Sequence, residues 1–387
     1  MPAFNGTWNY PTPVRFGPGR IAELPQACAE LGIRRPLLVT DRGLADLSIT
    51  KDTVAVLDAG DLPTAVFSGV EGNPTGAMVE AGVAAFKGGG HDGVVAFGGG
   101  SALDVGKAVA LMIGQTRPLF EFEDRADWWT RIDPEGMRPL VAVPTTSGTG
   151  SEVGRASVIT DEAVHVKKII FHPGMLPARV ICDPELTTGL PRGVTAATGL
   201  DALSHNLEAW CAPGFHPLAD GIALEGMRLV HRHLIRACEE GGDVDARSGM
   251  MAASLMGATA FQKGLGGMHA MAHPIGAIVG AHHGLTNAVV MPYVLRANRE
   301  AILERSADLA RALDLAGHDF DALLQWVLDL REALDIPTTL QGIGVSHAQL
   351  SQLSEMATQD PSAGGNPVSF DRDFSERLFE RAFSGEL

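Results

Sequence analysis

The stretch Val94-Val-Ala-Phe-Gly-Gly-Gly-Ser-Ala-Leu-Asp-Val-Gly-Lys107 joins an apolar run, three glycines and a segment of helical periodicity. The apolar run predicts a buried strand, and residues 98–100 predict a tight turn before a helix that opens at Ser101. Free N–H groups and the positive end of the helix dipole make such an N-terminus a good site for a pyrophosphate. The stretch therefore predicts an α/β sheet with a phosphate-binding loop.

Two common nucleotide-binding motifs do not fit this stretch. A Walker A loop has four residues between its glycines, but here five residues separate Gly100 from Gly106. Ala108 follows Lys107, so the hydroxyl that would bind magnesium is missing. The G-x-G-x-x-G fingerprint is also absent, and the obvious acidic residue, Asp41, precedes the glycines. A tight turn without a ligand is the alternative for this loop considered alone.

The same alternation of strand and helix extends on both sides of this stretch. Short β-rich runs predict buried strands at 36–40, 65–70, 94–97, 140–143 and 180–182. Apolar stripes within 21–31 and 79–86 predict helices that cover a largely parallel sheet. We therefore expect a Rossmann-like, dinucleotide-binding α/β domain over residues 1–187.

After Pro191 the strand signal fades and segments of helical periodicity follow one another. The expected helices lie at 195–211, 217–239, 245–263, 284–315, 320–335, 346–357 and 373–383. Asp-Pro and Leu-Pro pairs mark turns near 183–192. We therefore expect an all-α second domain over residues 188–387.

The composition is typical of a packed globular enzyme and excludes several classes of partner. Hydrophobic residues make up 45% of the chain and no long polar tract indicates disorder. The formal charge of −16 opposes binding to nucleic acid or to an anionic membrane surface. Because we find no signal segment and no apolar run of about 18 residues, we expect a cytoplasmic protein. Four widely separated cysteines indicate free thiols rather than a disulfide framework.

A second loop, Pro144-Thr-Thr-Ser-Gly-Thr-Gly-Ser-Glu152, follows the strand at 140–143 and concentrates hydroxyls on small residues. Ligands of open α/β sheets bind at the carboxyl ends of the strands, where both loops are expected. The two loops together favour a nucleotide site. Hydroxyls that only cap the next element are the alternative for this second loop.

Residue types that bind metals recur at helical spacing in the second half of the chain. Asp201 and His205 are four residues apart, which places both side chains on one face of a helix. His269 and His273 have the same spacing, and a pair of histidines follows at 282–283. A carboxylate and several imidazoles suit a divalent metal. Hydrogen-bonded core histidines are the alternative, because the sequence alone does not show that these side chains converge.

Four motifs resemble those of the iron-containing, group III alcohol dehydrogenases, and they cover essentially the whole chain. They are GGGSALDVGK (98–107), PTTSGTGSEV (144–153), TGLDALSHNLEAW (198–210) and GGMHAMAHPIGA…HHG (266–284). The resemblance implies a dehydroquinate synthase-like architecture in which a divalent metal and a nicotinamide meet between the α/β domain and the helical domain. It also implies hydride transfer between a small alcohol and its aldehyde or ketone.

The resemblance implies specific roles for the histidines. The metal ligands would be Asp201, His205, His269 and His283. His273 would lie near the nicotinamide without binding the metal and would act as the catalytic proton relay. The metal would be Fe(II), with Zn(II) or Ni(II) as alternatives because the same nitrogen and oxygen ligands bind all three.

The resemblance further implies NAD, rather than NADP, as the cofactor. Asp41 would face the hydroxyls of the adenosine ribose, and Lys167 would reach a ribose. The other cofactor-binding residues would lie in or beside the two loops: Gly98, Gly99, Gly100, Ser101, Asp104, Thr145, Thr146, Thr149 and Ser151. We also expect a homodimer or a higher homo-oligomer.

Some features leave alternatives to a simple alcohol dehydrogenase. Arg155 departs from the residues that relatives often carry, and it would clamp a carboxylate in a 4-hydroxybutyrate-type enzyme. An exposed arginine at the rim is the alternative. Trp128-Trp129, within 120–138, lines either a cleft or an oligomer contact. A glycerol dehydrogenase-like enzyme, a dehydroquinate-synthase-like lyase and a non-catalytic nucleotide-binding metal protein are further alternatives.

Overall fold

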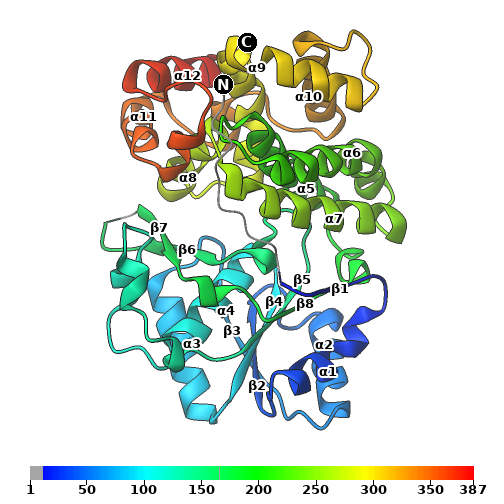
Figure 1. Ribbon diagram of the computed structural model, residues 1–387, viewed down its shortest axis with the longest axis vertical. Coiled ribbons are helices and arrows are strands. Elements are labelled where there is room, and N and C mark those ends of the chain that lie inside the picture. Colours follow the sequence, from blue (N-terminus) through cyan, green and yellow to red (C-terminus); the bar gives the residue numbers. More distant parts are fainter. Residues whose placement is uncertain (1–11, 165) are drawn as a thin grey trace. The chain divides into compact units, whose positions relative to one another are not determined.

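The computed structural model describes residues 12–164 and 166–387. The described chain forms two compact units, one that extends to Gly189 and one that begins at Leu190. The first combines a parallel sheet with helices, and the second consists of helices (Figure 1). The predicted fold class is thus confirmed. Among the described residues, no helix has both the length and the apolarity needed to cross a membrane.

The α/β unit is built on a sheet of six parallel strands. Their order is β1 (Val14–Phe16), β8 (Arg179–Cys182), β5 (Leu140–Pro144), β4 (Gly93–Gly98), β2 (Pro36–Asp41) and β3 (Ala65–Val70). All but β1 overlap predicted strands. The sequence does not predict β1 because three residues are too few to show a period.

Helices cover both faces of this sheet (Figure 1). They are α1 (Leu24–Glu30), α2 (Ser48–Ala59), α3 (Gly76–Gly89) and α4 (Gly100–Met112). On one side, apolar residues of α1 and α2 pack with strand residues such as Val95 and Val141. On the other side α4 lies so close to β4 that a Cβ at Gly106 would come within 2.5 Å of the Cβ of Ala96. This packing holds the start of α4 at the carboxyl end of β4.

A β-hairpin between β5 and β8 is absent from the sequence-based prediction. β6 (Ala156–Asp161) pairs antiparallel with β7 (Val166–Phe171). Ile170 is fully buried, whereas Lys168 forms an ion pair with Asp161 at 2.7 Å. Because charged residues such as Asp161 and Lys168 lie among the apolar ones, the alternation that identifies a half-buried strand is weak here.

The helical unit largely follows the predicted pattern. Its helices are α5 (Arg192–Cys211), α6 (Pro217–Glu239), α7 (Val244–Ala260), α8 (Gly267–Val279), α9 (His283–Ala312), α10 (Phe320–Ala333), α11 (Leu350–Thr358) and α12 (Arg372–Ser384). α8 is missing from the predicted set because glycines at its start and Pro274 inside it interrupt the helical pattern. The structure tolerates this proline within a buried helix.

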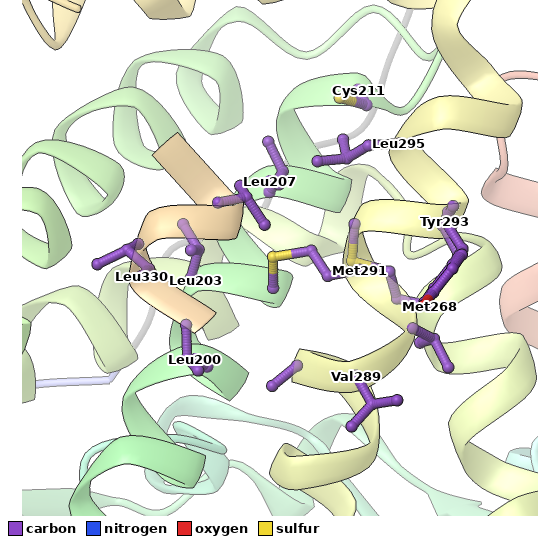
Figure 2. Close-up of a cluster of buried hydrophobic side chains, with 14 of the residues drawn as sticks. Leu200, Leu203, Leu207, Cys211, Met268, Val289, Met291, Tyr293, Leu295 and Leu330 are labelled. Carbon is purple, nitrogen blue, oxygen red and sulfur yellow. The ribbon is translucent and has the colours of Figure 1, made fainter. Parts of the chain in front are cut away.

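The central helix of this unit is α5, whose residues 199–211 are all buried. It packs against α6, α7 and α9. Figure 2 shows the apolar cluster to which α5 contributes Leu200, Leu203 and Leu207 and other helices contribute Met268, Met291 and Leu330. Because α5 is buried on all sides, each polar side chain that it carries needs a partner inside the protein.

Candidate metal centre and cofactor loops

The helical unit gathers one carboxylate and three imidazoles at a single point. Asp201 and His205 lie one turn apart on α5, His269 lies in the first turn of α8, and His283 begins α9. One ligand atom from each of the four lies within 4.8 Å of the others. The structure therefore brings together the same four side chains that the family resemblance implies as ligands.

Ring packing holds the imidazoles of this cluster in place. His205 stacks on His269 with ring centroids 4.7 Å apart, and His269 lies 5.2 Å from His283. Asp201, His205 and His269 are buried, whereas the His283 side chain keeps 27% of its surface exposed. Three imidazole nitrogens and one carboxylate oxygen form a set that suits a divalent transition metal. A buried carboxylate is also costly to desolvate, and a cation would offset that cost, so the residues fit such an ion.

Glu208, which the sequence analysis does not single out, fixes the orientation of one ligand. Its Oε2 accepts a hydrogen bond from His269 Nδ1 at 2.6 Å, and its Oε1 accepts one from the backbone N–H of Met268 at 2.6 Å. A carboxylate only accepts hydrogen bonds, so His269 carries its proton on Nδ1 and presents Nε2 to the cluster. Glu208 lies seven residues after Asp201, which places it on the same face of α5.

Several carboxylates act on the pKa of His269. Burial lowers this pKa, but Glu208, Asp201 and Asp360 raise it more, so it lies above its ordinary value. A proton therefore competes with a cation for this ring as the pH falls, because a metal ligand must be deprotonated.

His273 lies next to the ligands and is held by a second carboxylate. Its ring stacks on His283 with centroids 5.4 Å apart and an interplanar angle of 10°. Its Nδ1 donates to Asp360 Oδ2 at 2.8 Å. Burial raises the pKa of Asp360, but the hydrogen bond and the charge of His273 lower it more, so it lies below its ordinary value. The sequence analysis misses Asp360, because a loop aspartate far from His273 in the chain carries no local signal.

Two other polar residues of this region, His282 and Asn287, form hydrogen bonds that explain their positions. His282 precedes α9, and its Nδ1 accepts a hydrogen bond from the N–H of Leu285 at 3.4 Å. His282 therefore caps the helix. Asn287, one turn after His283, donates to Asp201 Oδ1 at 2.9 Å and is a further residue that the sequence analysis misses.

In the α/β unit, the two predicted loops lie side by side. Gly98 at the end of β4 pairs with Pro144 at the end of β5, and the N–H of Thr145 donates to the Gly98 carbonyl at 3.0 Å. Gly98 has a φ of 145°, which L side chains rarely adopt. A Cβ at Gly100 would overlap Thr149 Oγ1. The glycine turn is therefore bare because a neighbouring loop leaves no room for a side chain.

Three buried hydroxyls near the ends of β2 and β5 have no hydrogen-bond partner among the described residues. They belong to Thr40, Thr145 and Ser147. Asp41, which follows Thr40, lies so close to the glycine turn that a Cβ at Gly98 would be 3.4 Å from its Oδ2. Buried hydroxyls without partners are costly, so these positions fit a polar ligand. Ser101, in the first turn of α4, is half-buried.

Asp104 and Ser151 bind each other rather than leaving their polar atoms free. Ser151 Oγ donates to Asp104 Oδ1 at 2.5 Å, and the N–H of Val158 donates to Asp104 Oδ2 at 2.9 Å. The buried Lys107 ammonium lies 3.2 Å from Asp104 and donates to the carbonyls of Ser151 and Ala156. This network ties the second loop and β6 to α4. Lys167 lies on β7, opposite Thr160.

Glu152 is a buried carboxyl beside this network. Burial raises its pKa to about 7, although the charge of Lys107 opposes the rise. The group is therefore partly protonated near neutral pH, which is unusual for a glutamate.

The comparisons with known proteins agree over nearly the whole chain. Residues 11–184 match the family model described as iron-containing alcohol dehydrogenase. Residues 195–383 match the model of the C-terminal part of the same family. The chain belongs to the iron-containing alcohol dehydrogenase family. It is therefore an oxidoreductase, as the sequence predicts, and family membership argues against the lyase alternative.

Relatives of this alcohol dehydrogenase family cover almost the full chain. The 4-hydroxybutyrate dehydrogenase of Cupriavidus necator is 41% identical over 96% of this chain and 98% of its own length. The 1,3-propanediol dehydrogenase of Klebsiella pneumoniae is 36% identical over 95% of this chain and 96% of its own.

Solved structures of the family show the same fold. A crystal structure of a 1,3-propanediol oxidoreductase matches with a TM-score of 0.92 and 34% identity, over 98% of this chain and 100% of that one. The sulfoacetaldehyde reductase of Bifidobacterium kashiwanohense, solved in complex with NAD⁺, matches with a TM-score of 0.88 and 29% identity, over 99% and 100%.

Proposed function

We propose that this family member is an NAD-linked, Fe(II)-dependent dehydrogenase that interconverts a short hydroxyacid and its aldehyde acid. The observation that carries the proposal is the convergence of Asp201, His205, His269 and His283 within 4.8 Å. A non-catalytic metal protein is the rival, and it predicts NAD binding without turnover.

The ligand set provides the electrophilic half of the site. A divalent ion in it supplies the Lewis acidity that makes an alcohol hydroxyl easier to deprotonate. Through the hydrogen bond to Nδ1, Glu208 would leave Nε2 of His269 available to bind such an ion. Nitrogen and oxygen ligands suit Fe(II), whereas Zn(II) and Ni(II) compete for the same set.

His273 is the proposed proton carrier. Its Nδ1 is held by Asp360, which leaves Nε2 to accept the proton that the alcohol releases. The carboxylate also stabilises the imidazolium that forms, because it places a negative charge 2.8 Å from the ring.

The two loops of the α/β unit form the proposed NAD site. NAD bound there would supply the hydride-accepting chemistry, and the loops would supply its orientation. N–H groups at the start of α4, with Gly98 to Ser101, hold the pyrophosphate. Asp41 accepts from the adenosine ribose hydroxyls and repels a 2′-phosphate, which favours NAD over NADP. The NAD⁺ complex of the sulfoacetaldehyde reductase supports the choice of cofactor.

The remaining cofactor contacts follow from the same loops. Thr145, Thr146 and Thr149 line the nicotinamide side. The buried Thr145 hydroxyl has no hydrogen-bond partner among the described residues, and the cofactor would provide one. Asp104 and Ser151 act through their mutual hydrogen bond, which holds the loop in place. Lys167 reaches a ribose.

Arg155 is the proposed anchor for the substrate carboxylate. It is half-buried and forms no ion pair with a carboxylate of the described residues. Its guanidinium lies 5.6 Å from the ring centre of Phe171. Burial raises the pKa of the nearby Asp124, and the charge of Arg155 only partly offsets this rise. A guanidinium that forms no direct ion pair can bind a substrate carboxylate in bidentate fashion. The 4-hydroxybutyrate dehydrogenase relative supports this substrate class.

Anaerobic purification, metal analysis and an NAD-coupled assay test the proposed function. We expect stoichiometric metal and NADH formation with 4-hydroxybutyrate, and slower turnover with 1,3-propanediol. Binding of metal and NAD without turnover of any alcohol, diol or hydroxyacid would establish the non-catalytic rival.

A matched pair of substrates tests Arg155. In Arg155→Leu, kcat/KM for 4-hydroxybutyrate should fall by roughly 10- to 100-fold, because a charge-assisted hydrogen bond contributes about 1.5–3 kcal/mol. The kcat/KM for 1,4-butanediol, which lacks the carboxylate, should change little. Equal losses with both substrates would show that Arg155 is not the anchor.

Two other expectations also remain proposals, namely a homodimer or higher homo-oligomer and a cytoplasmic location. Light scattering in solution measures the first, and cell fractionation measures the second.

A further inference from the structure

Asn287 occupies an unusual position beside the metal ligands. It lies on α9, one turn after His283, and it is fully buried. Its Nδ2 is 2.9 Å from Asp201 Oδ1, 3.3 Å from His269 Nε2 and 3.2 Å from His283 Nε2. One atom at similar distances from three ligand atoms lies over the triangular face that they define.

The chemistry of Asp201 decides which way the Asn287 amide points. A ligating carboxylate accepts hydrogen bonds but does not donate them, so the NH₂ group rather than the carbonyl oxygen must face Asp201. The two imidazole nitrogens also face this NH₂ group, and neither can turn its lone pair to it while binding a cation. The hydrogen bond that remains when a cation is bound is therefore the one to Asp201.

The other end of the same amide indicates why an asparagine stands here. Asn287 Oδ1 is buried and has no hydrogen-bond partner among the described residues. A buried polar atom without a partner costs about 1–3 kcal/mol. The NH₂ end, by contrast, has a partner in Asp201, so the polar contact of this amide is made at the ligands.

Exposure limits where a substrate can enter. His283 has 27% of its side-chain surface exposed, against 5% for Asp201 and 2% for His269, so the accessible ligand is His283. Three faces of the four-ligand set include His283. Asn287 lies over one of them, and the two that remain both include His205.

We propose that Asn287 is a positioning residue that covers the ligand face away from His205, so that a substrate oxygen approaches beside His205 and His283. This proposal rests on the metal site of the proposed function. Asn287 also orients Asp201 through its hydrogen bond, which should strengthen metal binding because such outer-shell partners hold a ligand in its binding geometry. The side chain therefore has two separable effects, one of steric cover and one of hydrogen bonding.

Three variants of the full-length protein separate these effects. Asn287→Ala removes both the cover and the hydrogen bond. Asn287→Leu keeps a side chain of similar size over the face but removes the donor. Thr286→Ala is the matched control, because Thr286 is buried on the same turn and its hydroxyl donates only to the His282 carbonyl. Asn287→Ser, a milder truncation, replaces the alanine variant if that protein does not fold.

The readouts are the affinity for Co(II), from competition with a chelator, and the visible absorption of the Co(II) protein, which weakens as the coordination number rises. We expect both Asn287→Ala and Asn287→Leu to bind Co(II) about 10- to 100-fold more weakly than the wild type. Only Asn287→Ala should show the weaker absorption, because water enters through the opened face. Thr286→Ala should match the wild type in both.

Each other outcome refutes a defined part of the account. Identical absorption in Asn287→Ala, Asn287→Leu and the wild type would overturn the cover, and unchanged affinity in Asn287→Leu would overturn the role of the hydrogen bond. Both results leave the proposed metal site intact. Wild-type protein that takes up no Co(II), or takes it up equally after His269→Ala, would instead refute the metal site and this proposal with it.

Discussion

The metal centre and the cofactor loops each keep their geometry through a different kind of interaction. The four ligands come from α5, α8 and α9, and buried side chains such as Glu208 and Asn287 orient them. The two loops instead leave adjacent strands, and backbone pairing of Gly98 with Pro144 sets their positions. The metal centre should therefore be sensitive to changes in polarity, whereas the loops should be sensitive to changes in volume.

The largest effect is expected at the metal centre itself. His269→Ala removes a buried ligand, so metal affinity should fall by more than the 10- to 100-fold typical of outer-shell residues, and activity should fall with it. Metal content after dialysis and NADH formation measure this. His347→Ala is the control, because this exposed histidine lies in the same unit away from the cluster. A variant that keeps both metal and activity would contradict the assignment.

Glu152 tests whether polarity matters in the loops as well. Its pKa of about 7 lies above the ordinary 4.5, so its contribution to stability is present below about pH 4.5 and is lost as the pH rises through 7. The shift corresponds to roughly 3 kcal/mol near pH 8. Glu152→Gln should therefore stabilise the protein at about pH 8 and much less at about pH 5. Denaturant unfolding at both values checks this, and a gain that is equal at both would show that the carboxyl is not buried as described.

Glu208→Gln should weaken the metal centre without removing a ligand. Gln offers one acceptor and one donor, so it cannot accept from both His269 Nδ1 and the N–H of Met268. Metal affinity should fall about 10- to 100-fold, and excess metal should restore much of the activity. Failure of excess metal to restore it would point to a structural role only.

Gly100→Ala should show the sensitivity to volume. The new Cβ would overlap Thr149 Oγ1, so the Thr149 side chain or its loop must shift, at a cost of roughly 1–2 kcal/mol, or about 5- to 30-fold in NAD affinity. Metal content should stay unchanged. Gly88→Ala, on α3 with open space around it, is the matched control. Equal NAD affinity in both variants would show that the loop tolerates a side chain.

The same contrast explains what the sequence could predict. Asp201 and His205 share a helix, and the two loops follow apolar strands, so local periodicity indicates them without reference to the rest of the chain. The convergence of those two residues with His269 and His283 depends on how helices pack, and only the family resemblance implied it. Asp360 and Asn287 act through tertiary contacts, and no spacing in the chain marks them.

The secondary structure shows the same division. Long helices such as α6 carry a clear apolar stripe, so their bounds follow from the sequence. α8 carries glycines and Pro274, and its helical form depends on tertiary packing rather than on propensity. β6 and β7 carry charged residues such as Asp161 and Lys168 among their apolar ones, which hides the alternation.

The central claim is that four side chains from three helices hold one divalent ion. Its most direct test is an anomalous-difference map from crystals loaded anaerobically with a single divalent metal. We predict one strong peak per chain, with bonds of about 2.0–2.2 Å to Asp201, His205, His269 and His283. A peak bound elsewhere, or ordered ligands around a site that stays empty at saturating metal, would contradict the account.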